Sequence, residues 1–451
     1  MIPFTSNAPE VTMPYFDDYD LPLTTASDMA AMAYRDGVRL MLAAWPGAAA
    51  KLDVAISADP DFALAHAARA RLHAILAEGA NAKEAVDRAA ALVAVHGTER
   101  ERSHVDVITY AVTGQSKEAL TRAIAHLEQW PRDVIILSLP LGAFGLYAFS
   151  GMADHDQARV DLVERLGPHF DTDDWWFLTY HGWALAENGE VARGRTMLER
   201  SMDLRQENAN GAHALAHAMY EGGAGDDADA LIKAWLPNYD RSGILHGHIA
   251  WHAALVALER GDPAGALTIY DTHVQPSVSH GMPINVVSDA ASLLWRIAAY
   301  SHVVPEGLWS TIGSYAATRF PKAGHAFIDT HMAMIEAMTG DRSAFNARTA
   351  TLDTMAGNGT LGAGKVVPTI ARAMLAFADA DYPRTIALLE PETRDVARIG
   401  GSGAQREVVE DTLLVAYMRA GEAAKARALL DRRLHRRPSP RDSRWQESLV
   451  A

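Results

Sequence analysis

The stretch ENGEVARGRTMLERSMDL (Glu187–Leu204) sets the pattern of the whole chain, because a small turn residue, Gly189, is followed by a long helix-forming run. Comparable turns recur at intervals of about 34 to 40 residues, and a helix on each side of such a turn indicates tandem helix–turn–helix repeats. The turns fall at Gly79, Gly114, Gly151, Gly189, Gly223, Gly261, near Tyr300, at Gly340, near Asp379 and at Gly421.

This spacing predicts an all-α protein, a right-handed helix–turn–helix solenoid of about ten helix pairs. Each hairpin of such a solenoid buries its apolar face only against its neighbours. Residues 1–27 are acidic and contain prolines, so we expect an extended N-terminal arm whose segment Pro14–Thr25 packs on the solenoid. Residues 28–451 should form one continuous solenoid domain without a linker.

Several segments resemble tetratricopeptide repeats (TPRs), among them AISADPDFALAHA (Ala55–Ala67) and GEVARGRTMLERSMDL (Gly189–Leu204). Further segments resemble one family in particular, the tetratricopeptide repeat protein 38 family, and they follow one another along almost the whole chain. This resemblance implies a TPR-like fold and no settled activity. The segments are Leu21–Ser27, Asp59–Ala67, Thr98–Val105, Ala212–Glu221, His248–Leu255, Ala266–Ser277, Val286–Arg296, Phe327–Met334 and Ile399–Val408.

Composition excludes several classes of function. The net charge of −15 argues against a nucleic-acid partner, which requires a clustered basic surface. The chain has no cysteine, so disulfides and thiolate chemistry are excluded. No apolar run reaches the ~20 residues of a membrane span, and the first ten residues do not resemble a signal peptide. We therefore expect a cytoplasmic protein, and the excess of Arg over Lys suggests a bacterial source.

Two histidine pairs are the strongest candidates for chemistry. His213 and His217 are four residues apart, so they share one helix face, and His248 and His252 repeat this spacing on the next first helix. With Asp289 from the following first helix, they are predicted to converge as catalytic acid–base residues. A metal held by the four histidines is conceivable but not favoured, because the glutamate of an HExxH hydrolase is absent, and no cofactor is predicted.

Other polar residues are predicted to bind substrate around this centre. They occur on helices or turns where a side chain can face a cavity inside the solenoid, and the alternative for each is an ordinary packing or ion-pairing role. They are Glu101, His104, Asp271, His273, Arg296, His331, Gln405 and Arg406.

Two functions compete on this evidence. The first, which we favour at this stage, is an enzyme with a His/Asp/Arg-lined cavity that performs hydrolysis or another acid–base reaction on a small polar or anionic substrate. The second is a TPR scaffold that binds a peptide or protein in its groove. The abundance of histidine and scarcity of lysine favour the enzyme, whereas the usual role of the fold favours the scaffold. The sequence gives no indication of oligomeric state.

Overall fold

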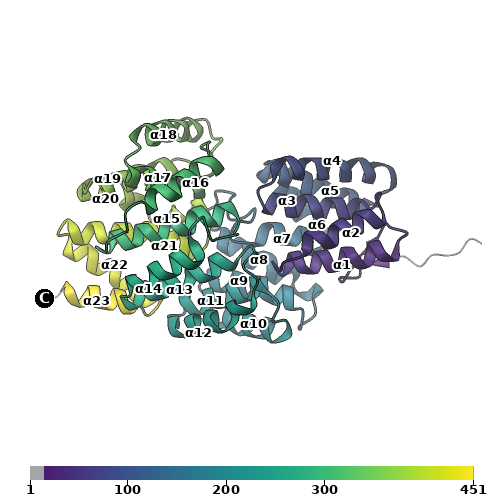
Figure 1. Ribbon diagram of the computed structural model, residues 1–451, viewed down its shortest axis with the longest axis horizontal. Helices are drawn as coiled ribbons and strands as arrows, with labels where there is room; N and C mark the ends of the chain where they lie inside the picture. Colours follow the sequence, from purple (N-terminus) through teal and green to yellow (C-terminus); the bar gives the residue numbers. More distant parts are fainter. Residues whose placement is uncertain (1–14, 450–451) are drawn as a thin grey trace, which may run out of the picture. The chain divides into compact units, whose positions relative to one another are not determined.

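The computed structural model describes residues 15–449 and confirms the all-α prediction. Within that range the chain forms 23 α-helices, a few single-turn helices and one two-stranded β-ribbon (Figure 1). The helices follow one another as antiparallel pairs, which is the arrangement of a TPR-like solenoid. None of the helices in residues 15–449 has the length and apolar character needed to cross a bilayer.

The helices group into two compact units. Unit 1 comprises residues 15–41 and 47–137, and unit 2 comprises residues 42–46 and 138–449. The elements of unit 1 are β1 (Tyr15–Phe16), β2 (Pro22–Leu23), α1 (Asp28–Leu42), α2 (Ala48–Ala58), α3 (Ala63–Ile75), α4 (Gly79–His96), α5 (Glu99–Val112) and α6 (Ser116–Gln129), and α7 (Val134–Leu141) begins in it. Whether the two units behave as the single predicted domain stays a prediction.

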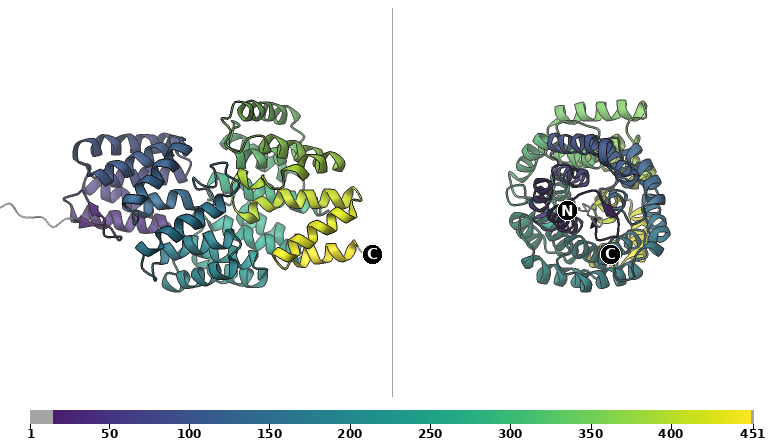
Figure 2. Two further views of the ribbon diagram at one scale, coloured as in Figure 1. Left: turned by 180° about the vertical axis from the view of Figure 1, so that it is seen from behind. Right: turned by 90° about the vertical axis from the view of Figure 1, so that its right-hand side faces the viewer.

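Unit 2 contains the remaining helices, which Figures 1 and 2 show in teal, green and yellow. Its α-helices are α8 (His155–Leu166), α9 (Trp175–Glu187), α10 (Val191–Leu204), α11 (Ala209–Glu221), α12 (Gly225–Trp235), α13 (His246–Arg260), α14 (Pro263–Ile269), α15 (Pro283–Ala299), α16 (Leu308–Arg319), α17 (Ala326–Thr339), α18 (Arg342–Gly357), α19 (Val366–Ala378), α20 (Tyr382–Leu389), α21 (Gly403–Arg419), α22 (Ala423–Arg436) and α23 (Pro440–Ser448). The short helices are η1 (Gly167–His169), η2 (Leu236–Asn238), η3 (Tyr270–Val274), η4 (Glu390–Glu392) and η5 (Val396–Ile399).

Small residues bring the two helices of a pair into close contact. On α9 and α10, a Cβ added to Gly182 would lie 2.8 Å from the carbonyl oxygen of Gly194, and one added to Gly194 would lie 2.5 Å from that of Gly182. Neither distance is possible for a real side chain. The turn between these helices contains Gly189 with a φ of 93°, a conformation that L-residues with side chains avoid. The sequence ENGEVARG therefore specifies both the turn and the tight packing that follows it.

The part of the N-terminal arm that the structure describes packs onto unit 1. Leu23 is 4% exposed, and the backbone and hydroxyl of Thr24 donate to Glu101 on α5 at 3.0 and 2.6 Å. The Arg100 guanidinium donates to the Pro22 carbonyl at 2.8 Å. Pro14, at which the predicted segment begins, lies outside the described residues.

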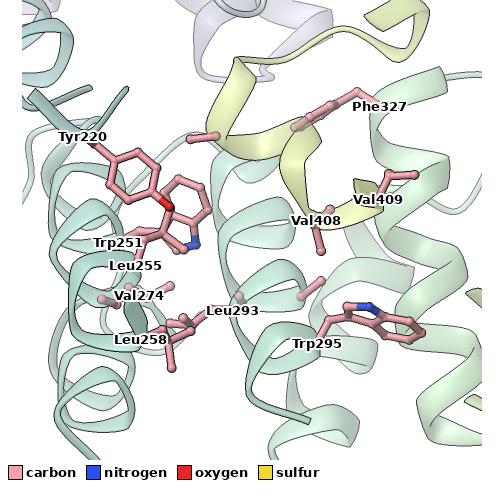
Figure 3. Close-up of a cluster of buried hydrophobic side chains, with 14 of the residues drawn as sticks. Tyr220, Trp251, Leu255, Leu258, Val274, Leu293, Trp295, Phe327, Val408 and Val409 are labelled. Carbon is pink, nitrogen blue, oxygen red and sulfur yellow. The ribbon is translucent and has the colours of Figure 1, made fainter. Parts of the chain in front are cut away.

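The first helices of the pairs fill the interior of unit 2. In addition to its neighbours α13 and α17, α15 packs against α21, which follows three pairs later, and α13 packs against α23. Figure 3 shows apolar side chains meeting between these helices, among them Trp251, Leu293 and Val408. The space that an open solenoid leaves as a groove is therefore occupied here by side chains of the chain itself.

Candidate functional site

The two histidine pairs converge inside unit 2. His213 and His217 lie on α11, and His248 and His252 lie on the adjacent α13. The rings of His213 and His248 have centroids 4.7 Å apart, those of His213 and His252 are 5.2 Å apart, and those of His217 and His252 are 4.9 Å apart. The i, i+4 spacing on two neighbouring helices thus brings four imidazoles together, and we call these four residues the histidine cluster.

Asp289 on α15 completes one side of the histidine cluster. Its Oδ2 lies 2.8 Å from Nδ1 of His248, and Nε2 of His248 lies 3.1 Å from Nε2 of His213. Burial raises the pKa of Asp289, and this effect is opposed by His248 and by hydrogen bonds from Ser288 and Gln405. The carboxyl group fixes the orientation of the His248 ring and holds its Nδ1 proton.

Glu187, at the end of α9, borders the histidine cluster from the other side and was not predicted. Its Oε2 accepts from the Gly403 amide at 2.8 Å, and its Oε1 lies 3.1 Å from Nδ1 of His217 without hydrogen-bond alignment. Burial, reinforced by Asp156, raises the pKa of Glu187 to about 8. At neutral pH this side chain is therefore protonated. Nothing in the sequence AENGE distinguishes it from an ordinary glutamate beside a turn.

The side chains of the histidine cluster are buried. His213 is 9% exposed, and His217 and His252 are fully buried. Burial lowers the pKa of all three, that of His217 to about 3, and neighbouring histidines add to this effect. The indole rings of Trp183 and Trp251 pack against the imidazoles with centroids 4.9 to 5.4 Å apart.

Three further predicted site residues lie close to this region but have other partners. Arg296 donates to Asp411 at 3.0 Å and to the Ala404 carbonyl at 2.7 Å, so it forms an internal ion pair between α15 and α21. Gln405 forms a capping box with Ser402 at the start of α21. Arg406 donates to Asp156 at 2.8 Å and also contacts the Gly401 carbonyl. The contacts of Arg296 connect α15 to α21, and its predicted binding role stays a prediction.

Three others in unit 2 are not part of the histidine cluster. Asp271 is exposed on η3. His273, also on η3, contacts the ring of His246 at 5.3 Å between centroids. His331 on α17 is 1% exposed, and its Nδ1 bonds to the Phe327 carbonyl at 2.8 Å, which is the ordinary role of a core histidine. His273 and His331 therefore contact other residues, and Asp271 lies at the surface, so none of the three joins the histidine cluster.

Glu101 and His104 belong to unit 1 and form separate networks there. Glu101 caps α5 and holds the N-terminal arm. His104 donates from Nδ1 to Asp133 at 2.9 Å, where His126 and Arg100 also bind. These contacts stabilise unit 1, and a binding role for the two residues stays a prediction.

A cleft with a volume of about 350 Å³ opens on unit 2 where α9 and α11 end beside α20, α21 and α22. Its walls combine apolar side chains with charged ones. The arginines are Arg394, Arg406 and Arg436, and the acidic residues are Glu187, Glu221, Glu407 and Glu410. The apolar residues include Val191, Leu389, Val396, Val409 and Leu413.

The chain is similar to several solved structures at low sequence identity. No family model matches it. The crystal structure of yeast Tom70 is similar at 11% identity and a TM-score of 0.33, over 93% of this chain and 95% of that one. The TPR domain of P58(IPK) is similar at 12% identity and a TM-score of 0.21, over 87% of this chain and 99% of that one. IFIT1 with Gppp-AAAA is similar at 14% identity and a TM-score of 0.29, over 92% of this chain and 75% of that one.

These similarities do not confirm the resemblance to the tetratricopeptide repeat protein 38 family. The enzyme interpretation, by contrast, must be corrected. The four imidazoles pack against one another and against two indoles, and these six side chains are 0–9% exposed. The histidine cluster is therefore packed as part of the core of unit 2, which removes the open cavity that the enzyme interpretation assumed. The scaffold alternative is the better interpretation.

Proposed function

We propose that the protein is a TPR-type scaffold that binds a short segment of a partner protein in the cleft between α9, α11, α20, α21 and α22. The observation that carries this proposal is the combination of an apolar cleft with arginines at its walls, in a unit whose interior is otherwise filled. TPR scaffolds commonly bind an extended peptide along a surface formed by several helices. The small-molecule substrate of the enzyme interpretation has no part in this proposal.

The charges of the cleft favour a partner segment that carries a carboxylate. Arg394 is exposed at its edge without an ion pair among the described residues, whereas Arg406 pairs with Asp156 and Arg436 pairs with Glu407 and Glu410. Among the acidic residues, Glu187 is protonated because its pKa is raised to about 8, and burial raises the pKa of Glu221 as well. The cleft is therefore less negative than its composition suggests, in a chain whose net charge is −15. An acidic peptide with a neighbouring apolar side chain fits this surface.

A displayed library of random peptides, selected against the purified full-length protein, tests the proposal. We expect enrichment of peptides with a carboxylate beside an apolar residue. Fluorescence anisotropy should then show that Arg394→Glu and Val396→Asp each weaken binding about tenfold or more, which is the size of one lost charged or apolar contact of about 1.4 kcal/mol. The matched control is Arg432→Glu, because Arg432 is exposed on α22 and does not line the cleft.

Two results would contradict the proposal. One is a library from which no sequence class is enriched. The other is a set of enriched peptides whose affinity is the same for the Arg394→Glu and Arg432→Glu proteins, since binding would then occur elsewhere. Membership of the tetratricopeptide repeat protein 38 family, a bacterial source and a cytoplasmic location remain part of this proposal, and fractionation of cells that express the tagged chain tests the location.

A further inference from the structure

The histidine cluster contains buried nitrogen atoms without hydrogen-bond partners among the described residues. Among residues 15–449, neither ring nitrogen of His252 has a hydrogen-bond partner, and neither ring nitrogen of His217 has one in acceptable geometry. Both side chains are fully buried. An unsatisfied buried polar group costs about 1–3 kcal/mol, so native proteins rarely retain several at one place. Each of these two rings therefore has a nitrogen available to a ligand.

The positions of the nitrogen atoms fit a metal ion. His213, His248 and His252 each offer one ligand atom, and these atoms all lie within 4.8 Å of one another. The Nε2 atoms of His213 and His248 are 3.1 Å apart. Two ligands of a tetrahedral ion with bonds of 2.0–2.1 Å would be separated by about 3.3 Å, so this pair is already at coordinating distance. His217 stands next to the three, with its ring 4.9 Å from that of His252.

The surroundings prepare the imidazoles as ligands. Asp289 accepts a hydrogen bond from the Nδ1–H group of His248. The other nitrogen of that ring, Nε2, then presents its lone pair to the cluster. This arrangement of carboxylate, histidine and ion is common in metal sites, because the carboxylate orients the ring and raises its basicity.

A second group of metal-ligating residues, His104, His126 and Asp133 in unit 1, lacks these features. Arg100 already neutralises the Asp133 carboxylate, with its Nη1 2.9 Å from Oδ2. His126 uses both nitrogens, one with Ser103 at 2.9 Å and one with Asp133 at 3.2 Å. In this group only Nε2 of His104 lacks a partner, whereas both nitrogens of His217 and of His252 lack one in the histidine cluster.

We propose that His213, His248 and His252, with His217 as the adjacent fourth ligand, hold one divalent transition-metal ion, Zn²⁺ before others. Imidazole nitrogen suits Zn²⁺, Ni²⁺ and Cu²⁺ and is a poor ligand set for Mg²⁺ or Ca²⁺. The site is closed by four side chains and two indoles, so the ion is structural and joins α11 to α13. This inference is independent of the peptide cleft.

The test measures metal content and fold together. Full-length protein is dialysed against EDTA, then given one equivalent of Zn²⁺ or Co²⁺ and desalted. We expect about one ion per chain by mass spectrometry, a higher melting temperature with Zn²⁺, and the intense visible absorption of tetrahedral Co²⁺. His252→Asn and His213→Gln should each lose the Co²⁺ spectrum and most of the bound Zn²⁺. His331→Gln, which changes a buried histidine outside the cluster, should keep both.

The opposite results overturn the proposal. Wild-type protein that retains no Zn²⁺ or Co²⁺ after desalting, and whose melting temperature does not respond to either ion, has no such site. Retained metal that survives both cluster substitutions lies somewhere else. If His252→Asn does not fold, His217→Asn and the Co²⁺ spectrum of the wild-type protein test the proposal instead. An octahedral or absent Co²⁺ spectrum excludes a four-nitrogen site. The peptide-binding assay is unaffected by these outcomes and tests its own proposal.

Discussion

The Arg296 guanidinium donates to Asp411 over 3.0 Å, although 115 positions separate the two residues in the chain. Both side chains are almost completely buried, at 2% and 0% exposure. The pair connects α15 to α21, which belong to repeats three pairs apart. Arg433 and Arg441 bind the other carboxylate oxygen at 3.0 and 3.3 Å, so Asp411 is the common partner of three arginines.

Removing the charge of Asp411 should be severely destabilising. Asp411→Asn leaves Arg296, Arg433 and Arg441 with one carboxylate fewer in a dry interior, and we expect a loss of about 3–5 kcal/mol in unfolding free energy. Urea titration followed by circular dichroism measures it. Asp353→Asn is the matched control, because Asp353 pairs with an arginine at the surface and should cost less than about 1 kcal/mol. Equal losses of unfolding free energy in the two variants would show that the buried ion pairs contribute no more to stability than a surface pair does.

Replacement of Gly400 should also destabilise the fold. Gly400 has a φ of 83°, and a Cβ there would lie 2.6 Å from the Phe149 ring and 2.7 Å from the Ala148 carbonyl oxygen. Gly400→Ala should cost about 2–4 kcal/mol, the sum of left-handed strain and a clash with backbone. Gly421→Ala carries similar strain, with a φ of 76°, but no described atom lies within 4 Å, so it should cost only about 1 kcal/mol. Thermal melts of both variants test this difference.

His331 should contribute to acid sensitivity. Burial lowers its pKa from 6.5 to about 4, against the opposing hydrogen bond to the Phe327 carbonyl. A depressed histidine pKa gives stability that is present above pH 6.5 and is lost as the pH falls from 6.5 to 4, up to about 3 kcal/mol. His331→Gln keeps a donor for Phe327 and removes the titration, so its unfolding free energy should fall less steeply in this window. A pH dependence identical to that of the wild type would refute the assignment.

Glu101 should anchor the N-terminal arm. It accepts two hydrogen bonds from Thr24 and one from the Thr98 backbone at 2.9 Å. Glu101→Ala removes all of them and should cost about 2–3 kcal/mol and expose the arm to limited proteolysis. Glu99→Ala, at an exposed position of the same helical turn, should change stability by less than about 0.5 kcal/mol. Unchanged protease resistance in the Glu101→Ala protein would mean that the arm is held by its apolar contacts alone.

The repeat pattern could be predicted from the sequence because each turn is determined by residues that are close together in the chain. The predicted turns coincide with the ends of paired helices, and Gly189 and Gly261 have the positive φ that their turns require; at the first turn Gly79 begins α4, and Ala77 has the positive φ instead. Two turns without glycine were still located by spacing; there Ser301 and Ala380 adopt φ of 72° and 58°. A further pair, α1 with α2, adds to the predicted set, and Gly47 precedes its second helix.

The histidine cluster was only partly readable. The i, i+4 spacing places His213 and His217 on one face of their helix, and the repeat period places α13 beside α11, so the convergence follows from sequence. Glu187 and the filled interior do not, because both depend on contacts between helices far apart in the chain. Arg296 was assigned to a cavity for the same reason: its partner, Asp411, is not identifiable from local sequence.

The contact between α15 and α21 also constrains how this chain can evolve. In an open solenoid each repeat touches only its neighbours, so whole repeats can be duplicated or deleted without disturbing the others. In unit 2, loss of one repeat between these helices would displace α21 by a full helix-pair step and separate Arg296 from Asp411. Gain or loss of a whole repeat in this segment would therefore break the ion pair. Sequences that descend from this one can instead diverge by substitution or by lengthening of turns.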